Sequence, residues 1–502
     1  MFFPRVRGER FKQTPSVIQK DGINLSKSGS FDNPNRFQWS NNLTKFARNR
    51  FQTFNRFIPY DKIPNTSGTI VSRTSAPTYS GEHSSDGKLF YSADRNFNIN
   101  IYDPNKPLVS PHSGVDEEYR EEHETTMHHI ARITGNYSGW TITDCHLSSD
   151  NNWLIYSRIS PTAHLVNLEA PETQIPLPFL DNGYSDFGYG TGLWSLRFSA
   201  DNSEIVAGGS DGQIYLYDLN ARRCTLRLQA HQNDVNAVAF NDISSNVLIS
   251  GSDDCVCKIW DRRSLNVARS SGVLIGHTEG ITFLSSKNDG RYVASNGKDS
   301  SIRIFDLRKM ISSIDFDDTT KVTPPYKFSV PGYDYRSSFV PQPKYEKHPQ
   351  DNSIVTLKGH LVSRTLIRAR FSPCGKYIYS GSADGKIYIW SVQGHIVQVI
   401  DRRYSNSLAR FDEKGEIVPN DPSTPENIRT NHAVNRPPII RDVSWNPQYG
   451  NPYIMSTSWD WDESGSLCYH EYKSLTKMQN NIEDWVEKQY SESLEKNRNQ
   501  ID

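Results

Sequence analysis

Short apolar runs separated by turn residues fill the chain from about residue 67 to residue 472. One clear example is the run from Cys255 to Trp260, which follows small and turn-forming residues from Ser250 to Asp254. Its thiol, β-branched and aromatic side chains suit a strand that is buried on both faces, and the run is too short for an ordinary helix. The pattern therefore predicts many short strands joined by tight turns.

The turn before such a strand recurs along the chain. Its aspartates are Asp211, Asp254, Asp299, Asp384 and Asp460, and the first four are followed six residues later by Tyr217, Trp260, Phe305 and Trp390. The first three aspartates are spaced by roughly 40–45 residues, which is the length of a WD-repeat blade. Two weaker copies at residues 92–103 and 140–168 bring the number of units to seven, a common number for a closed β-propeller.

The predicted fold class is all-β, a seven-bladed WD-repeat β-propeller over residues 66–472 with a partly helical or disordered N-terminal extension. Insertions rich in Pro, Asp and Asn occur near residues 310–350 and 402–436. The first insertion follows a predicted third strand and the second follows a predicted fourth strand. We therefore expect them on opposite faces of the propeller.

The two ends of the chain differ from the repeats. Residues 1–65 are polar and read as a disordered tail, except that apolar positions at helical spacing predict a basic amphipathic helix near residues 42–58, which includes Phe46 and Phe54. This helix could lie against its own domain or dock on another protein. Residues 473–502 are charged, and a frayed helix is expected there.

Composition and charge narrow the function classes. Lys and Arg number 56 against 57 Asp and Glu, which argues against general nucleic-acid binding. The six cysteines show no disulfide spacing, and no apolar run reaches the length of a signal peptide or a membrane span. We expect a soluble protein of the nucleus and/or cytoplasm that binds neither nucleic acid nor membrane.

Three sets of polar residues have the spacing to link turn, strand and preceding loop inside a blade by hydrogen bonds. They are His231, Ser250, Asp254 and Trp260; His277, Ser295 and Asp299; and His360, Ser380, Asp384 and Trp390. A buried aspartate needs such donors, and recurrence favours a structural role over catalysis or metal binding. Phe305 replaces the tryptophan of the second set, so that network is expected to be weaker.

The residue patterns that could indicate an enzyme do not have the spacing that the corresponding motifs require. The histidines His123 and His128 are five residues apart, whereas a zinc-protease helix needs four, and residues 116–129 read as a solvated acidic loop. Cys255 and Cys257 lack a second ligand pair and read as buried thiols. The glycines at residues 188–192 precede a strand, without the helix that binds phosphate. We predict neither catalysis nor a metal or cofactor.

Two arginines are not needed by the blades that carry them. Arg263 and Arg308 each follow by three residues the aromatic that ends a third strand, so neighbouring blades present them at the same rim. Arginine is enriched at interfaces because its planar fork pairs with carboxylates. Pairing with an acid of a neighbouring blade is the alternative for each residue.

The aromatic-Asp-x-Arg pattern at Asp261 with Arg263 and at Asp306 with Arg308 is similar to the motif by which WD-repeat substrate receptors bind the adaptor of cullin-4 ubiquitin ligases. Further stretches resemble one subfamily, that of DDB1- and CUL4-associated factor 11 and the plant LEC14B proteins. These stretches are residues 234–245, 280–283, 295–299, 333–336, 365–373, 441–447 and 456–460.

The resemblance implies a propeller that docks on a DDB1-like adaptor and through it on cullin-4, and that presents unknown protein substrates for ubiquitination. It implies adaptor contacts at Asp261, Arg263, Asp306 and Arg308, and it makes the helix with Phe46 and Phe54 a candidate for the adaptor's cleft. Two other functions stay open. One is a WD-repeat scaffold unrelated to ubiquitin, and the other is a metal-dependent hydrolase with His and carboxylates converging in the central channel.

Overall fold

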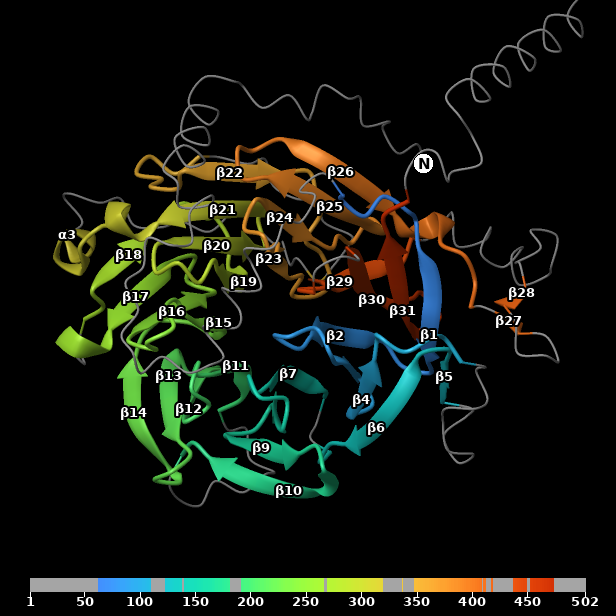
Figure 1. The fold of residues 1–502 in the computed structure, drawn as a ribbon. Coiled ribbons are helices and arrows are strands. Elements are labelled where there is room, and N and C mark those ends of the chain that lie inside the picture. Colours follow the sequence, from blue (N-terminus) through green and yellow to red (C-terminus); the bar gives the residue numbers. More distant parts are fainter. Residues whose placement is uncertain are drawn as a thin grey trace, which may run out of the picture.

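Seven antiparallel sheets stand around a common axis in the computed structural model (Figure 1). The structure describes residues 62–109, 122–137, 140–180, 191–265, 269–318, 336, 347–408, 410–411, 417–418, 437–448 and 452–473. The expected helix near residues 42–58 and the tail after residue 473 lie outside the described residues. The seven-bladed all-β prediction is confirmed.

We label the blades A to G in chain order, and in each the strands run outward from the axis. Blade A contains β2 (Thr78–His83), β3 (Phe90–Asp94), β4 (Asn98–Asp103) and β6 (His128–Thr134). Blade B contains β7 (Ile142–Leu147), β8 (Trp153–Arg158), β9 (Thr162–Asn167) and β10 (Ala170–Pro178). Blade C contains β11 (Leu193–Phe198), β12 (Glu204–Gly209), β13 (Gln213–Asp218) and β14 (Arg223–Gln229).

The next three blades follow the same order of strands. Blade D contains β15 (Val235–Phe240), β16 (Val247–Ser252), β17 (Cys257–Asp261) and β18 (Gly272–Leu274). Blade E contains β19 (Ile281–Ser286), β20 (Tyr292–Gly297), β21 (Ser301–Asp306) and β22 (Val355–Lys358). Blade F contains β23 (Ala369–Phe371), β24 (Tyr377–Ser380), β25 (Lys386–Ser391) and β26 (Ile396–Asp401).

Blade G joins strands from distant parts of the chain and closes the ring. Its inner strands are β29 (Ile439–Trp445), β30 (Tyr453–Trp459) and β31 (Gly465–Glu471), and its outer strands are β1 (Thr69–Thr74) and β5 (His123–Thr125). Thr69 pairs with Tyr469 and Thr74 with Gly465 in the antiparallel register of β1 and β31. The ring is therefore held shut by hydrogen bonds and not by a covalent connection.

The strand β5 corrects the expectation of a solvated loop over residues 116–129. His123 is buried, and its Nε2 lies 3.1 Å from Ser72 Oγ and 2.9 Å from Tyr102 Oη. These partners come from β1 and β4, far away in the sequence, so local polarity around residue 123 does not reveal the burial. Residues 116–121 lie outside the described residues.

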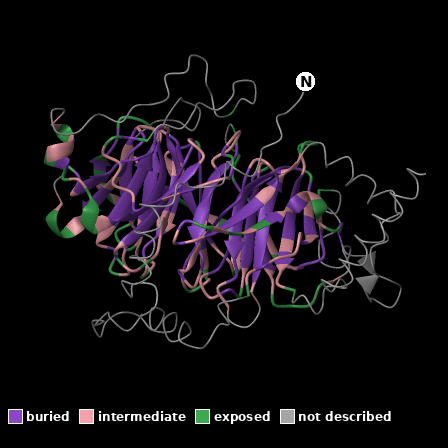
Figure 2. Cartoon of the chain, turned by 90° about the horizontal axis from the view of Figure 1, so that it is seen from above, coloured by how far each residue is buried: buried purple, intermediate pink, exposed green. Residues whose placement is uncertain are grey.

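The hydrophobic core lies between successive blades. Both faces of most strands are covered, as in β20, all of whose residues are buried. One apolar cluster joins Tyr292, Ile302 and Ile304 of blade E to Ile378 and Trp390 of blade F. This packing explains why the predicted strands are nearly continuous apolar runs without strict alternation. Figure 2 shows the buried strands as a thick band with its exposed residues mainly in the loops and edges.

The antiparallel order gives the ring two distinct faces. We call near face the side where the first strand of a blade turns into the second and the third into the fourth, and far face the opposite side. The connection from β21 to β22, with α3 (Ser313–Asp317), leaves the near face, whereas the connection from β26 to β29 leaves the far face. The two insertions thus leave opposite faces, as predicted. The second one includes the ribbon of β27 (Arg410–Phe411) and β28 (Ile417–Val418).

Helices contribute little to the described part of the chain. Besides α3 there are three short 3-10 helices, η4 (Arg262–Ser264), η5 (Leu307–Lys309) and η6 (Arg402–Tyr404). None of the described helices is long and apolar enough to cross a membrane.

Candidate docking interface

The Asp-x-Arg pattern forms the same small structure in blades D and E, which we call an Asp-x-Arg corner. In each corner the aspartate that ends the third strand caps a 3-10 helix by accepting from the backbone N–H of the arginine two residues later. The arginine side chain then folds back onto that carboxylate. Asp261 with Arg263 and Asp306 with Arg308 therefore lie on the near face, in neighbouring blades.

The guanidinium group of each corner is fixed and yet open to solvent. Arg263 Nε and Nη2 lie 2.8 and 2.7 Å from the two carboxylate oxygens of Asp261, and the corresponding distances from Arg308 to Asp306 are 3.3 and 3.1 Å. The arginine side chains are 66% and 65% exposed. Each arginine thus pairs with the acid of its own corner and not with that of a neighbouring blade.

A second arginine forms an ion pair at each corner. Arg291 donates to Asp306 Oδ2 through Nε at 3.1 Å and Nη2 at 2.8 Å, so this buried carboxylate holds two guanidinium groups. Arg262 of the other corner reaches blade C, where its Nη1 and Nη2 lie 2.6 and 2.8 Å from the carboxylate oxygens of Glu204. The pKa of Asp261 is lowered mainly by the hydrogen bond from Arg263. The corners are preorganised before any partner arrives.

A third Asp-x-Arg corner was missed by the sequence analysis. Arg403 Nε and Nη2 lie 2.9 and 2.5 Å from the carboxylate oxygens of Asp401, and Asp401 caps η6 as the others cap η4 and η5. This corner follows a fourth strand and lies on the far face. The available signal was the Asp-Arg-Arg string at residues 401–403, which repeats that at residues 261–263.

The polar network inside the blades forms as expected in blade D. His231 Nδ1 lies 2.8 Å from Asp254 Oδ2 and its Nε2 lies 2.7 Å from Ser250 Oγ, which also accepts from Trp260 Nε1 at 3.1 Å. Burial lowers the pKa of His231, so the ring is held neutral in spite of Asp254. These side chains join turn, strand and loop and serve the fold.

Blade E repeats the network without the indole. His277 Nδ1 lies 3.1 Å from Asp299 Oδ2 and its Nε2 lies 2.6 Å from Ser295 Oγ. Ser301 adds a hydroxyl donor to Asp299 at 2.7 Å, where blade D has Val256 at the same place. Burial raises the pKa of Asp299, but His277, Arg303 and the hydroxyl outweigh it and hold that pKa below its usual range.

The third expected set is wrong as a set, because its members bond elsewhere in blade F. His360 Nε2 lies 2.8 Å from Asn296 Oδ1, and Trp390 Nε1 donates to the carbonyl of Lys358 at 3.1 Å. Asp384 instead accepts from Tyr388 Oη at 2.8 Å, and Ser380 Oγ donates to backbone carbonyls. Tyr388, four residues after Asp384, is the donor to that carboxylate in place of a histidine. Blades D and E have Lys258 and Arg303 at that position, which leaves the aspartate to histidine.

Charged side chains of the first strands meet around the propeller axis in what we call the axial ion cluster. Its members are Glu82, Asp144, Arg197, Arg368, Arg370 and Asp442. Arg368 Nη2 lies 2.7 Å from Asp144 Oδ1 and its Nη1 lies 3.1 Å from Asp442 Oδ2. Arg197 Nη1 also reaches Asp144 at 2.5 Å, and Arg370 Nη2 lies 3.2 Å from Glu82.

This cluster bears on the hydrolase hypothesis, because carboxylates do converge at the axis. Each of them is nevertheless matched by guanidinium groups. Burial raises the pKa of Glu82, but Arg370 and Arg197 outweigh it and bring the pKa to about 2. Within the described residues, no three His, Cys, Asp or Glu side chains gather so that they could hold a metal ion. Charged residues inside otherwise apolar strands, such as Arg441-Asp442, were the sequence signal for this cluster.

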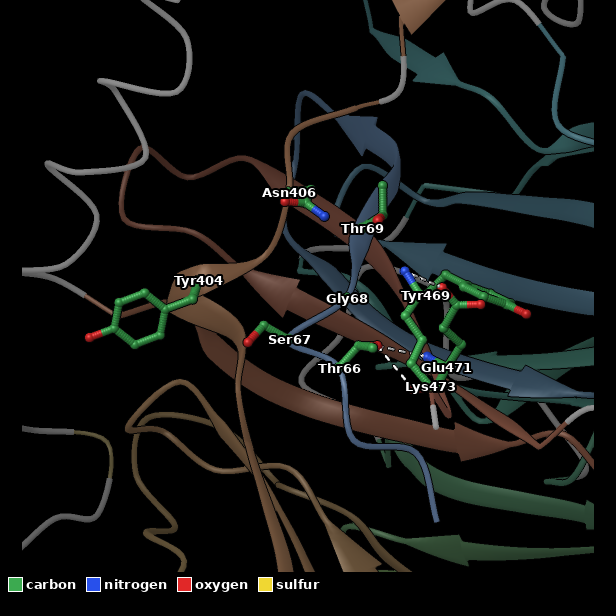
Figure 3. Close-up of a pocket in the computed structure, with 9 residues that line it drawn as sticks. All are labelled: Thr66, Ser67, Gly68, Thr69, Tyr404, Asn406, Tyr469, Glu471 and Lys473. Atoms are coloured by element: carbon green, nitrogen blue, oxygen red, sulfur yellow. Dashed lines mark hydrogen bonds and ion pairs between the residues drawn. The ribbon is translucent and has the colours of Figure 1, made fainter. Parts of the chain in front are cut away.

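A small pocket lies at the seam between blades F and G (Figure 3). It encloses about 110 Å³ and is lined by Thr66, Ser67, Gly68, Thr69, Tyr404, Asn406, Tyr469, Glu471 and Lys473. Thr66 Oγ1 bonds the backbone of Glu471, and Asn406 N donates to the carbonyl of Gly68. Its lining thus consists largely of groups that hold the ring closure together.

Comparison with known proteins identifies the repeats and the family. The family described as "WD domain, G-beta repeat" matches residues 184–218, 222–261, 268–306 and 351–391. A LEC14B protein of Lithospermum erythrorhizon is 35% identical over 425 residues, which cover 82% of this chain and 76% of the relative. The chain belongs to the LEC14B family of WD-repeat proteins. Two of the matched repeats end at Asp261 and Asp306, the aspartates of the near-face corners.

Two further relatives carry one each of the two names of the subfamily. A LEC14B homolog of Prunus armeniaca is 34% identical, with 78% of this chain and 72% of the relative covered. A protein of Caenorhabditis briggsae named "DDB1- and CUL4-associated factor 11 homolog" is 30% identical over 56% of this chain and 47% of the relative. The resemblance to the subfamily of these two names is confirmed.

Proposed function

We propose that this LEC14B-family chain is the substrate-recognition subunit of a cullin-4-type E3 ubiquitin ligase. In this proposal the near face docks on a DDB1-like adaptor, which connects the chain to cullin-4, and another surface binds the protein that is to be ubiquitinated. The observation that carries the proposal is the pair of matching Asp-x-Arg corners on neighbouring blades. The names of relatives such as the nematode homologs support the choice of partner.

The geometry of the corners suits docking. A guanidinium group that its own carboxylate already orients loses little conformational freedom when a partner binds its remaining N–H edge. Arginine in such a position is a common hot spot of interfaces. Because the two corners stand on rigid neighbouring blades, a partner can engage both at once.

The chain itself supplies binding and positioning in this proposal, and the transfer of ubiquitin belongs to other subunits. The helix near residues 42–58, with Phe46 and Phe54, is proposed as a second adaptor contact. The proposal also places the assembly in the nucleus and/or cytoplasm. All six cysteines are free thiols, which is the usual state in these reducing compartments.

The decisive experiment compares Asp-x-Arg corners on the two faces. The Arg403 side chain pairs with its own aspartate in the same way but is only 25% exposed, against 66% and 65% for Arg263 and Arg308. The double variant Arg263→Ala with Arg308→Ala and the control variant Arg403→Ala are expressed and purified in parallel. The amount of adaptor that co-purifies with each is then measured. We expect the double variant to lose adaptor by roughly tenfold or more, the effect of removing one or two hot-spot residues, whereas the control retains it. Full recovery by a folded double variant would contradict the adaptor site. A complex that never contains adaptor or cullin would favour the alternative of a scaffold unrelated to ubiquitin.

A further inference from the structure

The exposed aromatic side chains of the described residues gather in the connections of the far face. Tyr137 and Trp140 lie between blades A and B, Trp461 lies between β30 and β31, and Tyr404 lies in η6 after β26. Tyr137 is 81% exposed and Trp140 is 46% exposed. Tryptophan and tyrosine at a surface are the residue types that most often anchor a partner.

Trp140 belongs to a row of aromatic rings that crosses three blades near the axis. Its ring centroid lies 6.2 Å from that of Trp194 in blade C, in an edge-to-face arrangement, and 6.2 Å from that of Tyr79 in blade A. Tyr79 in turn lies 6.1 Å from Trp459 of blade G. Tyr79 is buried and Trp194 and Trp459 are partly buried, whereas Trp140 is exposed.

One end of this row is acidic. Trp194 Nε1 donates to Asp234 Oδ2 at 3.0 Å, so the carboxylate is fixed beside the indole. Burial and the nearby Asp253 raise the pKa of Asp234. Lys298 Nζ lies 2.7 and 2.8 Å from the oxygens of Asp253, and its positive charge partly offsets the rise in the pKa of Asp234.

On its other side Trp140 adjoins Tyr79, whose ring already carries a cation. Arg441 lies over the ring of Tyr79 at 5.4 Å, and its Nη1 donates to the carbonyl of Tyr79 at 2.6 Å. A cation that joined the row would therefore be directed away from Tyr79, toward Trp194 and Asp234.

The chain itself shows what kind of group fits an exposed tryptophan on this face. Trp461, which is 44% exposed, has the guanidinium carbon of Arg364 at 4.1 Å from its ring centroid. Trp140 is equally exposed, but within the described part of the chain no lysine or arginine lies over its ring at such a distance. The Trp140 side thus offers the indole and, through Trp194, a carboxylate.

Two exposed apolar side chains, Tyr137 and Ile159, belong to the same face, and we call them the apolar shelf. Tyr137 belongs to the same connection as Trp140, and its ring lies 5.2 Å from that of Phe97. Ile159, which is exposed, packs beside Gly192 at the start of the segment that carries Trp194. Apolar residues next to a bound cation could lie on this shelf.

We propose that Trp140, Trp194 and Asp234 bind a lysine or arginine side chain of a protein segment whose neighbouring apolar residues lie on Tyr137 and Ile159. An indole face and a carboxylate together favour a cation over a neutral or acidic side chain. The inference rests on the proposed function in that this segment belongs to the protein presented to the ligase. It places that protein on the face opposite the adaptor corners.

The test selects short random peptides, displayed on phage, against the purified full-length chain. We expect the selected peptides to share a lysine or arginine flanked by apolar residues. A selection that returns acidic peptides, peptides without a basic residue or no peptide at all would overturn the proposal.

A selected peptide is then made with its basic residue and with glutamine in its place, and binding is measured by fluorescence anisotropy. We expect the glutamine peptide to bind at least about tenfold more weakly, and Trp140→Ala or Asp234→Asn to weaken the basic peptide to a similar degree. Asp234→Asn keeps an acceptor for Trp194, so its fold should be intact. The effects of the peptide change and of Asp234→Asn should not add, because both remove the same ion contact.

Controls separate this site from the adaptor site. Trp461→Ala changes an equally exposed tryptophan of the same face and should leave peptide binding unchanged, as should the double variant Arg263→Ala with Arg308→Ala. Trp140→Ala and Asp234→Asn should still co-purify adaptor. If neither the unchanged chain nor any variant co-purifies adaptor, that result counts against the proposed function alone. If Asp234→Asn binds the basic peptide with unchanged affinity, that result counts against this site alone.

Discussion

Arg368 of blade F reaches across the propeller axis to Asp144 of blade B, with 2.7 Å between its Nη2 and the carboxylate Oδ1. Its other terminal nitrogen bonds Asp442 of blade G at 3.1 Å. One buried side chain thus connects blade F to the next blade, G, and to blade B on the other side of the ring. The attraction of Asp144 and Asp442 raises the pKa of Arg368 well above its usual range in spite of burial.

Removal of this arginine should destabilise the whole ring. Arg368→Met keeps much of the side-chain volume but leaves Asp144 and Asp442 buried with fewer partners, and breaking a buried ion pair in this way costs about 3–5 kcal/mol. The midpoint of urea unfolding, followed by tryptophan fluorescence, would measure the loss. A midpoint equal to that of the unchanged protein would show that the cluster contributes nothing to stability.

Stability should fall as the pH is lowered through the range below about 6.5. His470 is fully buried, and burial together with Arg402 lowers its pKa to about 3. Between its usual pKa of about 6.5 and about 3, the unfolded chain binds a proton at this residue that the folded chain does not, so the free energy of unfolding decreases as the pH falls. Glu82, with a pKa of about 2, adds a loss below its usual pKa of about 4.5.

The measurement is the unfolding midpoint in urea between pH 7 and pH 4. In His470→Gln the curve should be flatter over this range than in the unchanged protein, because one proton-linked group is removed. Identical slopes for the two proteins would refute the assignment to His470.

Two arginines that connect neighbouring blades should differ in how much they contribute to the free energy of unfolding. Arg402 is buried and donates through Nη2 to Ser466 Oγ at 2.8 Å and to the carbonyl of Ser466 at 3.0 Å, at the seam of the ring. Arg262 pairs with Glu204 at a site that solvent partly reaches. We expect Arg402→Ala to cost about 2–4 kcal/mol and Arg262→Ala about 1 kcal/mol or less.

Thermal unfolding and limited proteolysis of the two variants would compare these costs. Arg402→Ala should also make the seam more sensitive to protease, since it loosens the contact between blades F and G. An equal effect of the two substitutions would argue against a special role of Arg402 in closing the ring.

The helix predicted near residues 42–58 can be tested separately from the corners. If it docks on the adaptor, Phe46→Ala with Phe54→Ala should weaken adaptor co-purification by roughly tenfold without changing the unfolding midpoint, because large apolar anchors carry much of a helix-in-groove contact. If the helix instead packs on its own domain, the same variant should unfold more easily and keep the adaptor. Either result decides between the two alternatives.

The blades were predictable because each repeats a local pattern. The turn aspartates and the aromatics six residues later mark the second and third strands of blades C to F directly, and Asp254 with Trp260 is the clearest pair. Each of these residues acts within its own blade, so the spacing carries the information. The Asp-x-Arg corners were predictable for the same reason, and the copy at Asp401 could have been found from its sequence.

Features that depend on the closed ring were not predictable in this way. β1 has no turn aspartate, and it becomes an outer strand only because blade G lies beside it. The contact between Arg368 and Asp144 exists because first strands of opposite blades face one axis, which no local spacing encodes. His360 was assigned to Asp384 by analogy, but Tyr388 competes for the same carboxylate, and such competition is decided by geometry.

The pairing of β1 with β31 has a consequence for synthesis of the protein. The strand Thr69–Thr74 leaves the ribosome before any blade exists, and its partner Gly465–Glu471 emerges only after the other six blades. Until then β1 exposes an unpaired edge, and edges of this kind invite wrong pairing. Blades A to F can form locally while the chain grows, so we expect the last step of folding to be slow docking of the two ends, and chaperones to act on the open ring.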